Sequence, residues 1–182
     1  MTSMLYFTRG EIIAESGDVR IYEMHGEQYL EIGKGHTLWA DMNEVVEYAD
    51  QIGDKARGNC LEIGLGLGVA SEYILDRPKV KSLTTVEINE DVLEVYRQLN
   101  PGIDNKHRII HGSGHDFLLQ TDEKFDFVFL DFYNVIDEDT LIEIELYVEL
   151  SKRILRPEGE IIGWWDIYTP EEFVSEFERI FK

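Results

Sequence analysis

The stretch from Cys60 to Ser71 reads CLEIGLGLGVAS, and it decides the fold of the chain. Its first four residues form a short apolar run, as a buried parallel strand does. Three glycines then alternate with leucines, and the residues from Val69 to Leu75 have a helical pattern. A strand, a glycine loop and a helix begin a βαβ unit, which places an anion or a nucleotide at the N-terminus of the helix. Glycine suits this turn because it adopts positive φ angles and leaves room for a ligand beside the backbone.

A single glycine-rich turn also fits a purely structural role, and the next strand distinguishes the two interpretations. Residues Ser82 to Ile88 read SLTTVEI, an apolar and β-branched strand with Glu87 at its C-terminal end. Glu87 follows the glycines by about 20 residues, where nucleotide-binding doubly wound sheets carry an acid that accepts hydrogen bonds from the ribose hydroxyls. The two features together predict a nucleotide site.

The glycine spacing distinguishes between classes of nucleotide. The dinucleotide fingerprint G-x-G-x-x-G fails in both frames, because Val69 and Ser71 stand where its third glycine belongs. The stretch from Glu62 to Gly68 reads E-x-G-x-G-x-G instead. This pattern resembles the first motif of the class I S-adenosylmethionine (SAM) methyltransferases. The resemblance extends from Asn59 to the C-terminus.

The resemblance implies SAM as the cofactor and a role for each matching residue. Gly64, Gly66 and Gly68 are expected to pass beside the amino acid and ribose portions of SAM. Glu87 is expected to bind the ribose. Glu62 is expected either to bond the amino end of the cofactor, directly or through water, or to satisfy amides of the loop.

The adenine end of the site departs from the family pattern. Residues 112–118 read GSGHDFL, and Ser113 stands where the family often has an aspartate that accepts a bond from the adenine amino group. A hydroxyl accepts the same bond without a charge, and Asp116 either compensates or begins the next helix. The cofactor-binding residues that the resemblance implies are Glu62, Gly64, Gly66, Gly68, Glu87, Ile88, Ser113, Gly114 and Asp131.

The second informative stretch is Phe125 to Asp131, which reads FDFVFLD. Such an apolar run is typical of a strand that is covered on both faces. Ligands of open α/β sheets bind at the carboxyl ends of the strands, so Asp131, Tyr133 and Asn134 are expected to face the reacting end of the cofactor. Asp131 is the predicted general base or anchor for an amine or hydroxyl acceptor, and Tyr133 and Asn134 are predicted to orient that acceptor. The alternatives are a cap or loop hydrogen bond for Asp131 and simple packing for Tyr133.

The remaining patterns complete an α/β fold. Helices are expected at residues 41–52, 90–99, 140–155 and 170–182, and further strands at residues 108–111 and 160–165. We therefore predict an α/β protein with a doubly wound, Rossmann-like methyltransferase sheet that lacks the last two strands of the family. The edge after the fifth strand is then open, and either the N-terminal strands or another chain, such as a second copy in a homo-oligomer, would cover it.

The N-terminal region has a different pattern, and we predict a β-hairpin extension at residues 1–40 before a SAM-binding domain at residues 41–182. The strand-like segments are residues 11–14, 19–24 and 28–32, with a turn at residues 25–27. Residues 33–39 have the composition of a loop that covers a site. His36 in this loop is interpreted as an ordinary loop histidine, with a catalytic role as the alternative.

Composition limits the partners of the chain. The 182 residues carry 17 basic and 37 acidic side chains, a net charge of -20. An acidic surface repels nucleic acids and anionic membranes and attracts a cationic small molecule, although the charge also serves solubility alone. Long apolar runs and a signal-peptide pattern are absent from the sequence, so a cytoplasmic protein is expected. The single cysteine, Cys60, excludes an internal disulfide, and His111 and His115 are a poor ligand set, so no metal is predicted.

The order of these motifs also resembles the spermidine synthase branch of the methyltransferase fold. That branch transfers aminopropyl groups from decarboxylated SAM and carries two aspartates, three residues apart, after the fourth strand. Asp131 matches the first aspartate, and Asn134 replaces the second. The predicted function is a SAM-dependent methyltransferase of a small-molecule acceptor. The alternatives are a spermidine synthase-like aminopropyltransferase, a non-catalytic partner protein with the methyltransferase fold, and a nicotinamide-dependent enzyme.

Overall fold

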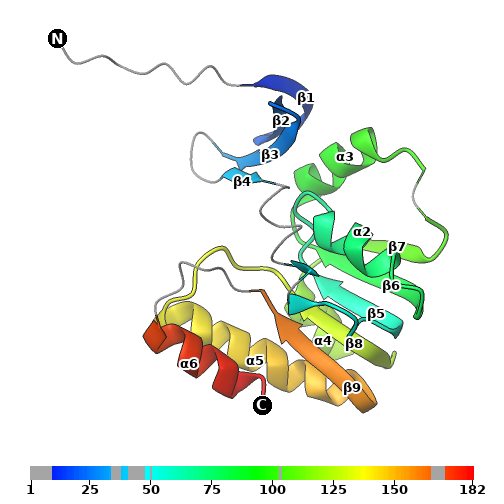
Figure 1. Ribbon diagram of the computed structural model, residues 1–182, viewed down its shortest axis with the longest axis vertical. Helices are drawn as coiled ribbons and strands as arrows, with labels where there is room; N and C mark the ends of the chain where they lie inside the picture. The colour runs from blue at the N-terminus through cyan, green and yellow to red at the C-terminus, as the bar shows by residue number, and fades with distance from the viewer. Residues whose placement is uncertain (1–9, 34–37, 41–47, 50, 103, 165–170) are drawn as a thin grey trace.

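The computed structural model describes residues 10–33, 38–40, 48–49, 51–102, 104–164 and 171–182. Two sheets organise these residues (Figure 1). The first is a four-stranded antiparallel sheet in the order β1-β2-β3-β4, and the second is a five-stranded sheet in the order β7-β6-β5-β8-β9. Every neighbouring pair in the second sheet is parallel, which confirms the predicted doubly wound α/β fold with a small β extension.

The N-terminal sheet contains the predicted hairpin. Its strands are β1 (Glu11–Ser16), β2 (Val19–Met24), β3 (Glu27–Ile32) and β4 (Leu38–Ala40). The turn between β2 and β3 has only two residues, His25 and Gly26, and both have positive φ angles, as tight hairpins require. The predicted loop at residues 33–39 was wrong for its last two residues, which pair with β3 as part of β4. His36 and most of the predicted helix at residues 41–52 lie outside the described residues.

The main sheet alternates strands and helices along the chain. The elements are β5 (Gly58–Ile63), α2 (Val69–Leu75), β6 (Val80–Glu87), α3 (Glu90–Leu99), β7 (His107–His111), α4 (Gly114–Gln120), β8 (Phe125–Leu130), α5 (Glu138–Ile154), β9 (Leu155–Gly163) and α6 (Glu171–Ile180). From β5 the chain proceeds outward to β6 and β7, then crosses back to β8 and β9. The order therefore reverses between β5 and β8, and this switch point is where open α/β sheets bind ligands.

Both faces of the main sheet are covered. In β8, Val128 and Leu130 pack in a cluster with α4, α5 and α6, whereas Phe127 and Phe129 pack on the other face, in a cluster with α2. All four side chains are fully buried. Burial on both faces is the physical reason for the continuous apolar run of this strand.

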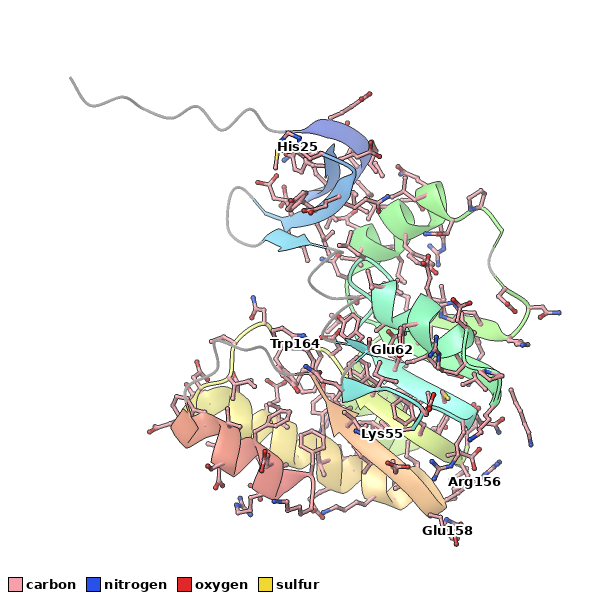
Figure 2. All side chains as sticks on the ribbon, viewed as in Figure 1. His25, Lys55, Glu62, Arg156, Glu158 and Trp164 are labelled. Carbon is pink, nitrogen blue, oxygen red and sulfur yellow. The ribbon has the colours of Figure 1, made fainter. Side chains whose placement is uncertain are left out.

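The last strand begins earlier than predicted. Leu155, which was assigned to the preceding helix, is the first residue of β9, and the predicted turn around Pro157 lies inside the strand. Glu158 has a positive φ angle in this region. Arg156 and Glu158 lie at one end of β9, and Trp164 follows the other end (Figure 2).

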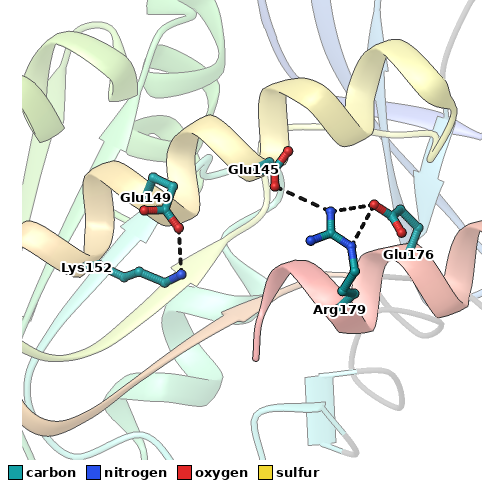
Figure 3. Close-up of polar contacts among 5 residues, drawn as sticks. All are labelled: Glu145, Glu149, Lys152, Glu176 and Arg179. Atoms are coloured by element: carbon teal, nitrogen blue, oxygen red, sulfur yellow. Dashed lines mark hydrogen bonds and ion pairs between the residues drawn. The ribbon is translucent and has the colours of Figure 1, made fainter.

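Helix α6 lies along α5 on the outside of the molecule. Arg179 of α6 forms ion pairs with Glu145 of α5 and with Glu176 of its own helix (Figure 3). These side chains are exposed, and exposed ion pairs contribute little to stability. The buried Phe177 and Ile180 therefore provide the main attachment of α6 to the core.

The N-terminal sheet packs against α3. Ala14, Val19 and Ile21 belong to the same apolar cluster as Val92 and Val95 of α3, and all are buried. A side-chain hydrogen bond of 2.7 Å from Ser16 to Asp91 joins the same elements. This packing fixes β3 above the carboxyl end of the main sheet.

Two glycines of the loop after β5 provide a matched test of the fold. Gly64 has a φ of +97°, and a Cβ atom there would overlap the backbone carbonyl of Asp131, whereas Gly66 has a φ of +52° with open space beside it. We expect Gly66→Ala to cost about 1 kcal/mol, the price of a left-handed alanine, and Gly64→Ala to cost roughly 2 kcal/mol more. Urea unfolding of the two variants measures the difference, and equal stabilities would contradict the close approach of the loop to β8.

Candidate functional site

A cavity of about 420 Å³ lies at the switch point of the main sheet. Its walls come from the end of β5 and the glycine loop, the end of β6 and the start of α3, the residues after β8, the N-terminus of α4, part of α5 and part of β3, with Tyr48 beside them. The predicted site residues that line it are Gly64, Gly66, Glu87, Ile88, Gly114, Asp131, Tyr133 and Asn134. Glu62, Gly68 and Ser113 are not among the lining residues. The structure thus brings together eight of the predicted residues around one space.

The three glycines of the motif have different structural roles. A side chain at Gly64 would meet the backbone of Asp131, and a side chain at Gly68 would meet the ring of Tyr96. Only Gly66 has open space beside it. The protein's own packing therefore requires two of the glycines, and the third leaves room for a ligand.

Glu87 organises the backbone around the cavity. Its Oε2 atom accepts a hydrogen bond of 2.9 Å from the amide of Leu65, and its Oε1 atom accepts one of 2.7 Å from the amide of Asn89. Each carboxylate oxygen has a second lone pair, so both can still accept a bond from a hydroxyl. The next residue, Ile88, lines the cavity with 71% of its surface exposed, which suits an apolar partner such as a flat ring.

Asp131 has a partner that the sequence did not reveal. The hydroxyl of Tyr48 donates a hydrogen bond of 2.6 Å to Oδ2 of Asp131. Tyr48 falls within the helix predicted at residues 41–52, and its ring packs edge-on against Phe129. The available signal was the residue type, because a buried tyrosine on an apolar face still needs a partner for its hydroxyl.

Aromatic rings form one wall of the cavity. Phe132 stacks on Tyr147 with ring centroids 4.0 Å apart, and Tyr133 meets Phe132 edge-on at 5.0 Å. The hydroxyl of Tyr133 donates a hydrogen bond of 2.8 Å to the carbonyl of Trp164, and burial raises the pKa of Tyr133 well above its ordinary value. Tyr133 therefore contributes its ring to the wall, as the packing alternative predicted, and Asn134 beside it is exposed.

The charged residues in the described lining of the cavity are all acidic. They are Glu87, Asp131 and Glu143, with no lysine, arginine or histidine among the described lining residues. Carboxylates that share a small space repel one another, and a cation between them relieves this repulsion. The cavity is therefore suited to a positively charged ligand.

Glu62 lies below the loop, on the face of β5 that α2 covers (Figure 2). Its Oε2 atom accepts hydrogen bonds from the hydroxyls of Ser71 and, at 2.6 Å, Thr85, so its partners are hydroxyls and not loop amides. Its Oε1 atom has no partner in the described part of the chain. Complete burial raises the pKa of Glu62 to about 8, although the two hydroxyl bonds oppose that rise.

The hydrogen bonds of Glu62 continue to His107. The Nε2 atom of His107 lies 2.8 Å from the hydroxyl of Thr85, and burial lowers the pKa of His107 to about 4. Ser113, by contrast, caps α4 by accepting a bond of 3.3 Å from the amide of Asp116. Asp116 lies in the first turn of that helix, as one alternative predicted.

Within the described ranges, no group of three or more His, Cys, Asp or Glu side chains could hold a metal ion. None of the described helices has the length and hydropathy to span a bilayer.

Comparison with known proteins identifies the family. A family model described as a methyltransferase domain matches residues 61–163, more than half of the chain. The chain belongs to this methyltransferase family. The match begins in β5 and ends with β9, so it contains the glycine loop, Glu87 and Asp131.

Solved structures share the fold at low sequence identity. A spermidine synthase from Thermotoga maritima matches with a TM-score of 0.71 and 16% identity, over 93% of this chain and 61% of that one. A spermidine synthase in complex with the transition state analogue AdoDATO matches with a TM-score of 0.69 and 16% identity, over 93% and 60%. A precorrin 8w decarboxylase from Methanobacterium thermoautotrophicum matches with a TM-score of 0.55 and 14% identity, over 76% and 67%. The chain thus spans about three fifths of the length of the spermidine synthases it resembles.

Two buried groups predict how stability depends on pH. The pKa of Glu62 is raised from 4.5 to about 8, so above pH 4.5 the folded state keeps a proton that the unfolded state has lost. The pKa of His107 is lowered from 6.5 to about 4, so below pH 6.5 the unfolded state binds the extra proton. Between pH 4.5 and pH 6.5 the two groups therefore change the stability in opposite directions. Above pH 6.5 only the Glu62 slope remains, and stability falls by up to about 1.4 kcal/mol per pH unit until about pH 8.

Urea unfolding between pH 6.5 and 8.5 measures this slope. Glu62→Gln should flatten it, because the amide does not titrate. Glu94→Gln makes the same chemical change at an exposed position on α3 and should leave the slope as in the wild type. A wild-type stability that rises with pH over this range would contradict the predicted behaviour of Glu62.

Proposed function

We propose that the chain is a SAM-dependent methyltransferase that acts on a small-molecule acceptor. The observation that carries the proposal is one cavity with Glu87 on the β6 side and the Tyr48–Asp131 pair on the β8 side, separated by the glycine loop. Membership of the methyltransferase family supports a cofactor of the SAM type.

The residues around the cavity fit such a cofactor. Glu87 has lone pairs available for ribose hydroxyls, and the exposed Ile88 offers an apolar surface to a base. The open space beside Gly66 allows close approach to the backbone, and the acidic lining suits a sulfonium cation. When bound, SAM supplies a methyl group that its sulfonium already activates, so the protein's work is positioning and proton removal.

Asp131 is the residue best placed to receive the acceptor's proton. It is partly buried at the cavity, and the hydroxyl of Tyr48 holds one of its oxygens. A carboxylate fixed in this way can anchor an ammonium group or accept a proton from an amine or a hydroxyl as the new bond forms. The aromatic pair of Phe132 and Tyr147 restricts access of water on the same side.

One observation favours the second candidate, aminopropyl transfer from decarboxylated SAM. The carboxylate of SAM has no cationic partner among the described lining residues, and decarboxylated SAM lacks that carboxylate. The similarity of the fold to spermidine synthases is consistent with this candidate. Asn134 argues against it, because the second aspartate of that branch is missing.

Calorimetric titration distinguishes the candidates. We expect SAM to bind the wild type and NAD not to bind. Glu87→Ala should weaken SAM binding at least tenfold, because two ribose hydroxyls lose a charged acceptor, each bond being worth roughly 1.5 kcal/mol or more. Stronger binding of decarboxylated SAM than of SAM would replace methyl transfer by aminopropyl transfer. An affinity for SAM that Glu87→Ala leaves unchanged would contradict the proposed ribose site.

Asp131→Asn tests the chemical role of the carboxylate. Methyl-labelled SAM and a panel of small amines and alcohols provide the assay. We expect Asp131→Asn to lower kcat, measured at saturating SAM, by about 10²-fold to 10⁴-fold, the range for loss of a general base. Asp137→Asn is the matched control, since Asp137 caps α5 from an exposed position where asparagine caps equally well. Full activity of Asp131→Asn would assign the base to another group.

A further inference from the structure

A chain of buried polar side chains crosses the protein beneath the glycine loop. It runs from Ser71 of α2 to Glu62 of β5, then to Thr85 of β6 and His107 of β7. The first three side chains have no exposed surface, and His107 has 8%. Buried polar groups are costly unless they are paired, so a chain through four elements suggests a function beyond stability.

The register of the sheet fixes this chain in place. Glu62 of β5 pairs directly with Thr85 of β6, so their side chains lie next to each other on the same face of the sheet. His107 pairs with Leu83, two residues before Thr85, and therefore also points to that face. The hydrogen-bonded route is thus set by the backbone and not by flexible side chains.

A proton can reside on Glu62 or on His107 without the movement of any heavy atom. When Glu62 is ionised, Thr85 donates its hydroxyl hydrogen to Glu62, and His107 donates from Nε2 to Thr85. When Glu62 is protonated, the direction of both bonds can reverse, with Nε2 of His107 as the final acceptor. The same contacts therefore serve both protonation states.

Charges in the cavity act on Glu62. Asp131, which follows β8, and Glu87, at the end of β6, both line the cavity, and both raise the pKa of Glu62 by repulsion. The charge of Glu62 in turn raises the pKa of Tyr96 on α3 and the pKa of Cys60 on β5. Ser71 and Thr85 contribute neutral hydroxyls. Because electrostatic coupling is reciprocal, a cation between Asp131 and Glu87 must favour the ionised form of Glu62.

We propose that binding of a cationic nucleoside cofactor in the cavity is coupled to ionisation of Glu62, whose proton leaves through Thr85 and His107. The proposal rests on the proposed function, because that function supplies the cationic ligand. In the transfer, the O–H bond of Glu62 breaks, Thr85 gains this proton and passes its own to Nε2 of His107, and His107 releases one proton from Nδ1. His107 lies toward the surface, near Asp104, which favours its transient cationic form. Glu62, Thr85 and His107 are positioning residues, since they act through the charge beneath the loop.

Calorimetry with SAM and, in parallel, decarboxylated SAM tests the coupling. Titrations at pH 6, 7 and 8, each in two buffers of different ionisation enthalpy, give both the affinity and the number of protons released. We expect proton release near pH 7 and an affinity that increases by up to about tenfold per pH unit below the pKa of Glu62. Infrared spectroscopy of the wild type at pH 7 should show a protonated carboxyl band, absent in Glu62→Gln, that decreases when SAM is added.

Four variants separate the coupling from general effects on folding. Glu62→Gln should bind with an affinity that does not change with pH and should release no proton. Thr85→Val should shift the pH dependence of the SAM affinity to higher pH, because Glu62 loses a hydrogen bond to its ionised form. Thr85→Ser should restore the wild-type dependence. Thr84→Val is the matched control, since Thr84 is the adjacent residue of β6 and its hydroxyl contacts Arg108 instead. Thermal unfolding confirms that each variant is folded.

Two outcomes would overturn the coupling, and they are distinguishable. If either nucleoside binds with the same affinity at all three pH values and with heats independent of the buffer, the coupling is absent while the proposed function stands. If neither nucleoside binds at any pH, the proposed function fails and the coupling fails with it.

Discussion

The architecture of the site depends on the carboxylate of Glu87, which holds two backbone amides at once. One amide belongs to Leu65 in the glycine loop, and the other belongs to Asn89 at the start of α3. Both loops lie at the carboxyl ends of adjacent parallel strands, where nothing else in the sheet pairs their amides. By binding both, the carboxylate fixes the distance between the loop and α3. The cavity that Gly64, Gly66 and Ile88 line exists because this distance is held open.

The concentration of acids around this cavity has a thermodynamic cost. Glu62 and Glu87 are buried, and Asp131 is close enough to raise the pKa of Glu62. The protein compensates with local donors: amides for Glu87, hydroxyls for Glu62 and the Tyr48 hydroxyl for Asp131. Neutral donors stabilise a carboxylate without cancelling its charge. The site is therefore stable enough to fold, and it keeps the negative charge that attracts a cation.

Sequence predicted the framework well because its signals are local. The alternation of β8 residues between two cores produces a continuous apolar run, and the three glycines reflect a tight turn in which all three residues have positive φ angles. Asp131 followed from a general rule about strand ends. The hydrogen bond between Asp131 and Tyr48 could not be predicted in this way, because Tyr48 is 83 residues away and hydrophobic periodicity carries no information about its hydroxyl. Likewise, the link from Glu62 to His107 depends on strand register, which local patterns do not encode.

The attachment of the N-terminal sheet to α3 also joins this sheet to the glycine loop. Leu30 and Ile32 of β3 line the cavity, whereas the glycine loop, Glu87 and Asp131 all belong to the main sheet. Leu30 belongs to one apolar cluster with Val92 of α3 and with Leu65 of the glycine loop. Substitutions in β3 therefore reshape one wall of the cavity and also change the packing of the glycine loop. The shape of the cavity can therefore be altered only by substitutions that the β3 wall and the glycine loop accommodate together.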